Sequence, residues 1–236
     1  MSIEQTIRVR RLGYEEPWLP DSFMAELPSD SVRQLERHGR VRRDIGSIAL
    51  TGDAASVIIV LNGAIKVFRS YSDGMQALVH VAGHGDVLNA EALFTSRDVP
   101  NAALAAGRGA AVLTVPRRRF GHLVNQHEDI RHSLMRSFAR GVQEHDMWRG
   151  HVGRTVDAKV WAFLVGLARR HGRPLPMGTL LSLGLTQPEI ASALGVSLGS
   201  VENAMRALRI AGRLRTSRAS VVLHGLPSEE ELDQYF

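Results

Sequence analysis

Cysteine is absent from this sequence, which excludes disulfide bonds, thiolate zinc sites and cysteine-held iron–sulfur clusters. Long apolar runs are absent too, because no stretch reaches the ~18 consecutive apolar residues that a membrane-spanning helix requires. The N-terminal stretch carries charges with no hydrophobic run after them, so it does not resemble a secretory signal. These absences predict a cytoplasmic protein with no membrane segment.

The charge that is present is unevenly distributed. The net charge is +5, and the stretch from Val201 to Ser220 holds five arginines against a single acid, Glu202. These arginines are Arg206, Arg209, Arg213, Arg215 and Arg218. A local basic block indicates a polyanionic partner, the alternative being a solvated basic face.

The residue composition changes along the chain and divides it into five segments. Residues 1–25 are irregular, 26–124 are rich in short strands and turns, 125–152 form a long helix with a hinge, 153–226 alternate helices with two final strands, and 227–236 are an acidic tail. A chain of 236 residues is long enough for two ordinary domains.

Short β-branched runs fill the second segment. The runs are Ala55–Leu61, Ala64–Phe68, Ala77–Val81 and Ala110–Val115. The turn signals between them are Gly52-Asp53, Asn62-Gly63, Asp73-Gly74 and Gly83–Asp86. Asn-Gly and Asp-Gly pairs supply the positive φ angles of tight hairpins, so we predict hairpins at these positions. Many short strands joined in this way favour an antiparallel barrel or roll.

A long helix is predicted from Arg117 to His151, and a shorter one over Thr155–Arg170. Apolar residues at alternating steps of four and three make a narrow seam along the long helix. The seam consists of Leu134, Phe138, Gly141, Val142, His145, Trp148 and Val152. Because the helix is too long to be covered by its own domain, we interpret the seam as a parallel two-helix dimer contact. The alternative is a helix lying on the barrel.

The stretch from Thr186 to Arg206 carries the most specific motif. Thr186 and Glu189 have the spacing of a capping box, Gly195 falls where the chain must turn with a positive φ, and Ser197 can cap a second helix. The residues predicted to pack the two helices together are Ile190, Ala191, Leu194, Val196, Val201, Met205 and Leu208. These offsets meet the packing demands of a helix-turn-helix. The alternative is an ordinary corner between two core helices.

A wing is predicted after this motif. Gly212 ends the second helix, and Arg213–Gly225 has the pattern of two short strands around a polar turn. Arginines there can reach phosphates, which give affinity and register but not sequence. Base reading is assigned to the exposed face of the second helix, where Glu202 can accept from cytosine and Asn203 can pair with adenine; Arg206 can reach a guanine, but its distance from the helix start favours a phosphate. The predicted DNA-contact residues are Thr186, Gln187, Ser197, Leu198, Gly199, Ser200, Glu202, Asn203, Arg206, Arg213, Arg215 and Arg218.

The order of these parts resembles the cyclic-AMP receptor protein/fumarate-nitrate reduction regulator family of bacterial transcription factors. The resemblance covers roughly Ile48 to Gly225 and rests on the turn pairs, on Ala92-Leu93-Phe94 and on Thr186–Arg206. It implies an α+β fold with an N-terminal antiparallel β-roll like that of cyclic-nucleotide-binding domains, a long dimerisation helix and a C-terminal winged helix-turn-helix. It also implies a homodimer that binds a near-palindromic site in double-stranded DNA, with RNA polymerase as a further partner and no enzymatic activity.

The sensor departs from the phosphate cassette of this family. The ribose-binding carboxylate of the family matches Ala90, with Glu91 one place out of register, and the phosphate-binding arginine matches Pro100. Losing the cation of a phosphate site forfeits a charge-assisted pair worth about 1.5–3 kcal/mol. We therefore expect no tight binding of cyclic AMP and no cofactor, so that either the effector is a different small molecule or there is none. The alternative is a regulator that binds a cyclic nucleotide through non-standard residues.

The candidate effector-pocket residues follow from the same match. They are Val87, Leu88, Asn89, Ala90, Glu91, Arg97, Pro100, Asn101, His145 and Asp146, the last two at the dimer-helix positions that contact the base in that family. The base-reading residues of the family match Leu198, Gly199 and Asn203, so its usual operator cannot be transferred to this chain.

Other classes of function compete with this interpretation. A metal-dependent barrel would use His80, His84 and Glu91 as ligands, but nothing in their spacing makes them converge, and we predict no metal site. A haem-binding sensor finds no ligand pair in the sequence. A nucleotide-binding regulatory subunit acting on another protein leaves the helix-turn-helix and the wing unexplained.

Overall fold

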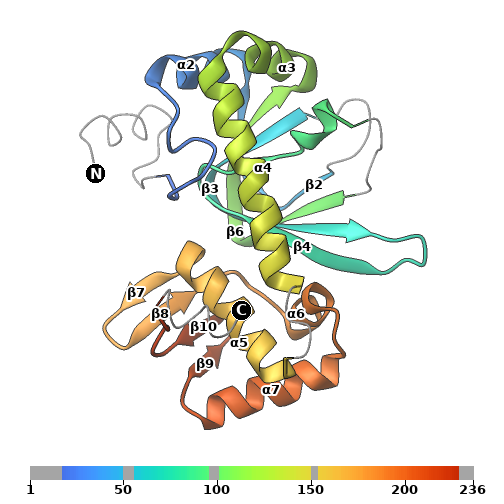
Figure 1. The fold of residues 1–236 in the computed structure, drawn as a ribbon, viewed down its shortest axis with the longest axis vertical. Helices are drawn as coiled ribbons and strands as arrows, with labels where there is room; N and C mark the ends of the chain where they lie inside the picture. The colour runs from blue at the N-terminus through green and yellow to red at the C-terminus, as the bar shows by residue number, and fades with distance from the viewer. Residues whose placement is uncertain (1–17, 50–55, 96–100, 150–153, 229–236) are drawn as a thin grey trace. The chain divides into compact units, whose positions relative to one another are not determined.

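The computed structural model describes residues 18–49, 56–95, 101–149 and 154–228 (Figure 1). The chain divides into two compact units, and each is described by itself. The first comprises Met1–Tyr71 and Val81–Gly141, and the second comprises Ser72–His80 and Val142–Phe236. Within the described ranges, no helix combines the length and apolar character that crossing a membrane requires.

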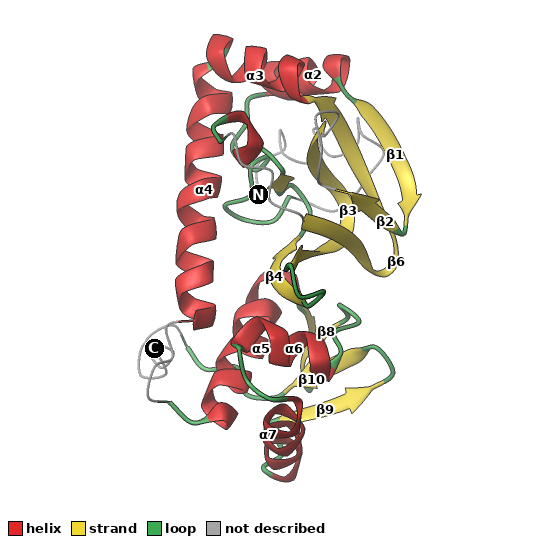
Figure 2. Ribbon diagram, turned by 90° about the vertical axis from the view of Figure 1, so that its right-hand side faces the viewer, coloured by secondary structure: helices red, strands yellow, loops and turns green. Residues whose placement is uncertain are grey.

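An antiparallel sheet forms the body of the first unit, although residues 76–80 of one of its strands are grouped with the second unit. Its strands are β1 (Arg40–Ile45), β2 (Ser47–Ala49), β3 (Ser56–Ser70), β4 (Gln76–Ala82), β5 (Val87–Leu88) and β6 (Asn101–Pro116). Strand β6 lies between β1 and β3, β4 follows β3, β2 pairs with β6, and β5 pairs with β3. Helices α2 (Ser29–His38) and α3 (Arg117–Gln126) lie together at one end of the sheet (Figures 1 and 2). The predicted α+β class with an N-terminal antiparallel roll is confirmed.

The Asn62-Gly63 pair forms a bulge, so the hairpin predicted there is wrong. Strand β3 runs through the pair, and its register against β6 shifts between Val60 and Asn62 and again between Asn62 and Ala64. Gly63 has a φ of 76°, and its N–H donates to Asn62 Oδ1 at 2.8 Å. The pair supplies a positive φ as predicted. The strand nevertheless continues, because the long strand β6 offers pairing partners on both sides of the bulge.

Two other predicted turns are confirmed. Asp73-Gly74 joins β3 to β4, with Gly74 at a φ of 82°. Gly83–Asp86 closes through the Asp86 N–H, which donates to Gly83 O at 2.9 Å. The predicted turn at Gly52-Asp53 lies outside the described residues.

The hydrophobic core of the first unit joins the sheet to α2, α3 and the first half of α4 (Glu128–Arg149). Phe23, Leu35, Phe120 and Ile130 have no exposed surface. Burying each such side chain contributes about 1.5–3 kcal/mol to folding. The core therefore fixes the start of α4 against the sheet.

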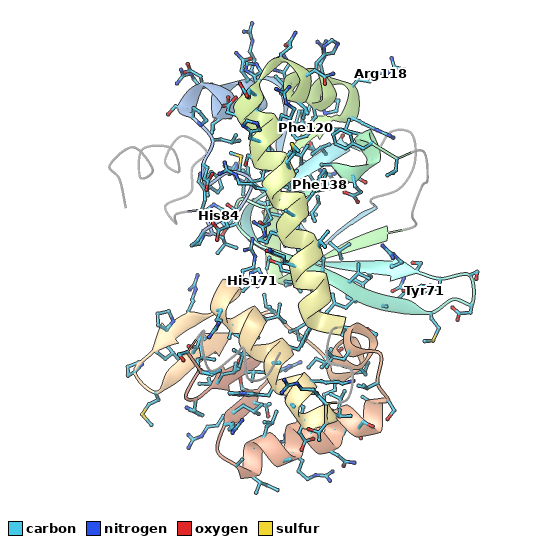
Figure 3. The ribbon with its side chains drawn as sticks, viewed as in Figure 1. Tyr71, His84, Arg118, Phe120, Phe138 and His171 are labelled. Atoms are coloured by element: carbon cyan, nitrogen blue, oxygen red, sulfur yellow. The ribbon has the colours of Figure 1, made fainter. Side chains whose placement is uncertain are left out.

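The segment Trp18–Met24 is fastened to the Gly83–Asp86 turn. The Leu19 N–H donates to His84 O at 3.0 Å, and the Met24 N–H donates to Gly85 O at 3.0 Å. The ring of His84, labelled in Figure 3, lies 4.2 Å from that of Trp18 between centroids. A side chain at Gly85 would overlap Ser22, so only glycine fits beneath this segment.

Arg140 of α4 completes this junction. Asp86 is only 1% exposed, and its carboxylate accepts from the Gly83 N–H at 2.9 Å and from Arg140 Nη2 at 2.8 Å. Arg140 also donates to the backbone carbonyl of Asp21. One guanidinium therefore ties the N-terminal segment, the turn and α4 together.

The single helix predicted from Arg117 to His151 is two helices, which corrects the prediction. Helix α3 ends at Gln126 and α4 begins at Glu128, because His127 is extended with a φ of −119° and a ψ of 112°. Glu128 and Asp129 give α4 an acidic first turn. Negative charge near the N-terminus of a helix interacts favourably with the helix dipole, which stabilises the beginning of a separate helix at Glu128.

The second unit contains α5 (Val156–His171), α6 (Gln187–Leu194), α7 (Leu198–Ile210) and a sheet of β7 (Arg173–Leu175), β8 (Gly178–Leu181), β9 (Leu214–Ser217) and β10 (Ser220–Leu223). The strand order is β7-β8-β10-β9. Helix α5 and the wing strands β9 and β10 were predicted. The β7–β8 hairpin was not, because Pro174 and Pro176 indicate a loop; Pro174 is tolerated because β7 is an edge strand.

Candidate DNA-binding site

Helix α6 begins at a capping box. Thr186 Oγ1 accepts from the Glu189 N–H at 3.3 Å, and Glu189 Oε2 accepts from the Thr186 N–H at 2.8 Å. Pro188 lies in the first turn, where a missing N–H leaves nothing unpaired. The predicted box therefore fixes the start of the helix. Thr186 is exposed and Gln187 is half-buried at this end.

The turn between α6 and α7 is short. Gly195 takes the left-handed conformation, with a φ of 64° and a ψ of 36°. The Val196 N–H donates back to Ala191 O at 3.1 Å, and Ser197 Oγ accepts from the Ser200 N–H at 3.1 Å to cap α7. The glycine turn and the serine cap give the predicted helix-turn-helix.

Helix α7 has an inner and an outer face. Val201, Ala204, Met205 and Leu208 are buried and hold the helix on its unit, where it packs against α5 and α6. The exposed residues of the helix are Leu198, Gly199, Glu202, Asn203, Arg206, Ala207, Arg209 and Ile210, and Ser200 is half-buried. In Figure 2 the helix lies at the margin of its unit. All the predicted base-reading residues are therefore on or beside an open face.

One hydrogen bond joins two residues of this outer face. Arg206 Nη1 donates to Asn203 Oδ1 at 3.2 Å, across a spacing of three residues. The sequence predicted separate roles for these side chains, Asn203 on a base and Arg206 on a phosphate. The structure brings them into contact.

The wing presents two arginines beside α7. Strands β9 and β10 pair antiparallel, with Leu214 opposite Leu223, and both leucines are buried. Arg215 in β9 and Arg218 in the turn are exposed. The buried leucines therefore hold a basic hairpin whose cations face solvent.

Two further arginines have contacts that the sequence did not predict. The Arg213 guanidinium lies over the Trp161 ring, 5.5 Å from its centroid, so part of its surface is used within the unit. Arg209 donates from Nη1 to Thr216 Oγ1 at 3.4 Å and links α7 to the wing. Arg209 was absent from the predicted DNA-binding residues, although its spacing of three from Arg206 was an available signal.

Two family models match the chain. The cyclic nucleotide-binding domain matches residues 47–127, and the Crp-like helix-turn-helix domain matches residues 158–228, which span α5 to the wing. The chain belongs to the cyclic-AMP receptor protein/fumarate-nitrate reduction regulator family. It is a transcription regulator with a DNA-binding helix-turn-helix.

Several known proteins are similar to this chain over most of its length. A probable transcriptional activator of Rhizobium leguminosarum bv. viciae is 23% identical over 213 residues, 88% of this chain and 86% of the relative. The structure of FixK2 from Bradyrhizobium japonicum has a TM-score of 0.63 at 20% identity and covers 84% of this chain and 96% of its own. The c-di-GMP responsive regulator CLP of Xanthomonas campestris has a TM-score of 0.64 at 18% identity, with 84% and 100% covered. These two structures show the shared fold.

The cassette residues of this regulator are spread over different surroundings. Val87 and Leu88 form β5, and Asn89 has a φ of 63° and donates from Nδ2 to Ser56 O at 3.2 Å. Ala90 is 1% exposed in the core, whereas Glu91 is exposed and begins the short helix η1 (Glu91–Leu93). The chain therefore leaves the extended conformation before Glu91.

The structure describes less of the remaining effector-pocket candidates. Arg97 and Pro100 lie outside the described residues. Asn101 lies at the start of β6, and His145 and Asp146 lie in α4, where the structure describes the backbone.

The dimer-helix residues of this family member divide between two faces of α4. Leu134 is 1% exposed and belongs to the core of its own unit, so most of its side chain is used within that unit. Phe138 (Figure 3) is half-buried, and its ring lies edge-on to that of Phe94 with 6.0 Å between the ring centroids. Val142 is 62% exposed, and Met135, which the sequence did not single out, is 61% exposed. Gly141 is half-buried, His145 and Trp148 lie further along α4, and Val152 lies outside the described residues.

The residues of the metal interpretation have different partners. The His84 ring contacts the Trp18 ring at a tilt of 53°, and His80 Nδ1 lies 3.5 Å from Glu144 Oε2. Among the residues that the structure describes, no group of three histidine, cysteine, aspartate or glutamate side chains could hold a metal ion.

Proposed function

We propose that this regulator binds a near-palindromic site in double-stranded DNA as a homodimer, with α7 of each protomer in the major groove and the wing on flanking phosphates. The outer face of α7 carries the proposal. Its polar side chains Glu202, Asn203 and Arg206 are exposed, and the exposed Arg215 and Arg218 lie in the adjoining wing. Base-reading groups beside phosphate-binding cations are what groove recognition requires.

Selection of bound duplexes from a random library tests this proposal. We expect two inverted half-sites whose centres are about 10–10.5 base pairs, or a multiple of that, apart. Recovery of one asymmetric site, or no retention of any duplex at low salt, would contradict it.

The exposed apolar side of α4 supports the homodimer. Met135 and Val142 are one heptad apart and open to solvent, as expected for residues that meet a partner helix. Met135 also lines an apolar cavity of about 440 Å³. It is lined mainly by Phe94, Val124, Leu134, Met135 and Phe138, with Glu91, Thr95, Asn125 and Arg131 contributing polar atoms. A second copy of the chain would cover this surface.

We propose further that the sensor does not use cyclic AMP. Ala90 is packed into the core where the family has a ribose-binding carboxylate, and Glu91 lines the surface cavity beside α4. Calorimetric titration with cyclic AMP and with cyclic GMP tests this, and micromolar affinity for either nucleotide would overturn it.

RNA polymerase is the further partner in this proposal, and the cytoplasm, where bacterial DNA lies, is the place of action. The similarity to a probable transcriptional activator supports a role at promoters rather than in catalysis. In vitro transcription from a promoter carrying the selected site should change when the regulator is added. An unchanged transcript level would count against this part of the proposal.

A further inference from the structure

Gly199 is a glycine that the fold of its own unit does not require. It lies in the first turn of α7, its φ is not in the left-handed region, and a Cβ built there would meet nothing within 4 Å. Glycine within a helix is unfavourable compared with alanine. Gly166 of α5 has the same open space, but it is half-buried, whereas Gly199 is exposed on the outer face of α7, where an external ligand can approach it.

The clearance at Gly199 stands one helical turn before Asn203. Residues four apart lie on the same side of a helix, and Gly199, Asn203 and Arg206 are all exposed. An approaching duplex would therefore meet a gap at Gly199 and then the two bonded side chains.

The contact between Asn203 and Arg206 sets the orientation of the Asn203 amide. A guanidinium has donors and no acceptor, so the Asn203 atom that faces Arg206 must be the oxygen, as the 3.2 Å contact to Oδ1 has it. The Nδ2 group then points away from Arg206 with both N–H donors available to a ligand. Together with the other N–H groups of Arg206, the pair offers an edge made mainly of donors.

We propose that Asn203 and Arg206 act as one base-reading unit that selects guanine, with Gly199 providing the clearance for the DNA. This inference rests on the proposed function, since it requires α7 to enter the major groove. Guanine presents two acceptors there, N7 and O6, whereas adenine presents one acceptor and the N6 donor. A donor edge matches guanine at both positions and meets adenine with one unfavourable pair. This proposal differs from the adenine contact that the sequence predicted for Asn203, and the base selected at that position will decide between the two.

Selection and titration of duplexes with three variants test the pairing. The wild-type protein should select guanine at one position of each half-site. Asn203→Ala and Arg206→Ala should each reduce the preference at that same position by roughly tenfold to a hundredfold. The double variant should lose little more than either single variant, because each already breaks the unit.

Arg209→Ala is the matched control, because Arg209 is an exposed arginine of the same helix that bonds to the wing. It should weaken binding to all sequences alike. Adenine at the shared position, or effects of Asn203→Ala and Arg206→Ala on two different base pairs, would overturn the inference while leaving the proposed function intact. Absence of duplex binding by the wild-type protein would instead defeat the proposed function.

Gly199→Ala separates a DNA role from a structural one. The substitution should raise the midpoint of thermal unfolding, because alanine is the better helix former, and should weaken binding to the selected duplex by about fivefold or more through overpacking against the DNA. Unchanged or tighter DNA binding by this variant would overturn the role assigned to Gly199.

Discussion

Asp86 is a carboxylate with almost no exposed surface, and Arg140 forms an ion pair with it. Arg140 has a side chain 17% exposed and lies 2.8 Å from it. An ion pair removed from water contributes little net stability by itself, but the loss of one partner leaves the other charge buried and uncompensated. The residue that matters most for this junction is therefore Arg140, although it lies on a helix outside the turn that it holds.

We predict that Arg140→Met lowers the free energy of unfolding by on the order of 3 kcal/mol, measured by urea denaturation. The control is Arg136→Met. The ion pair of Arg136 with Glu26 is exposed on both sides, so that variant should change stability by less than about 1 kcal/mol. Adding Asp86→Asn to Arg140→Met should recover part of the loss. If Arg140→Met and Arg136→Met lowered the free energy of unfolding equally, burial of the ion pair would not explain the effect of Arg140.

The wing arginines give a prediction of a different kind. Arg215 and Arg218 are exposed and are proposed to bind phosphates. Replacing both by alanine should flatten the plot of log K against log salt concentration by about 0.9 for each phosphate that is no longer neutralised, with base preferences unchanged. Fluorescence anisotropy at several salt concentrations measures the slope. A changed consensus sequence with an unchanged slope would show that they read bases.

At the scale of secondary-structure elements, the helix-turn-helix depends on local backbone geometry. Gly195 lies between α6 and α7 at a φ of 64°, and a Cβ there would meet nothing within 4 Å. A substitution at this position would therefore cost conformational energy alone, without a steric clash. Gly166 in α5 has the same open space but no positive φ, which makes it a matched control in the same unit.

We predict opposite effects of alanine at these two glycines. Gly195→Ala should destabilise the second unit by about 1–2 kcal/mol, because an L-residue is strained in the left-handed region. Gly166→Ala should stabilise it by roughly 0.5–1 kcal/mol, because alanine is the better helix former. Thermal unfolding followed by circular dichroism shows whether each substitution raises or lowers the stability. A stabilising effect of Gly195→Ala would contradict the left-handed conformation of the turn.

Elements held by local signals were predictable from the sequence. The box at Thr186 and the turn at Gly195 each lie within a few residues of the groups they satisfy, so the helix-turn-helix was found with its bounds. The Asn62-Gly63 pair misled the prediction because the pairing of β3 with distant β6 decides between a hairpin and a bulge.

The parts of the site that could not be predicted depend on three-dimensional contacts. The bond between Arg206 and Asn203 competes with other rotamers that the sequence allows equally. The burial of Leu134 is decided by a core assembled from several distant segments. Spacing along a helix gives the period of an apolar stripe, but the packing of the sheet decides which stripe faces inward.

At the scale of the whole molecule, the proposed assembly depends on an apolar surface that a single chain leaves open. Val142 and Met135 are each more than 60% exposed on α4. Two copies that pair these residues would bring two α7 helices into one assembly, and binding to DNA would then depend on the concentration of the dimer.

We predict that Val142→Glu raises the dissociation constant of the dimer by roughly a hundredfold, because two buried carboxylates would face each other without cations. Analytical ultracentrifugation measures this. Met177→Glu is the control, since Met177 is 74% exposed in the turn between β7 and β8 and is not part of the predicted seam. Dimers of unchanged stability in Val142→Glu would contradict the proposed seam.

The position of Arg140 along the chain also determines the order in which the first unit can be completed during synthesis. It follows Asp21 by 119 residues and Asp86 by 54. At about 5–20 residues per second on the ribosome, the guanidinium is made on the order of ten seconds after the carbonyl that it holds. The Trp18–Met24 segment therefore emerges first, the Gly83–Asp86 turn that bonds to it follows, and the junction is completed only after α4 has left the exit tunnel.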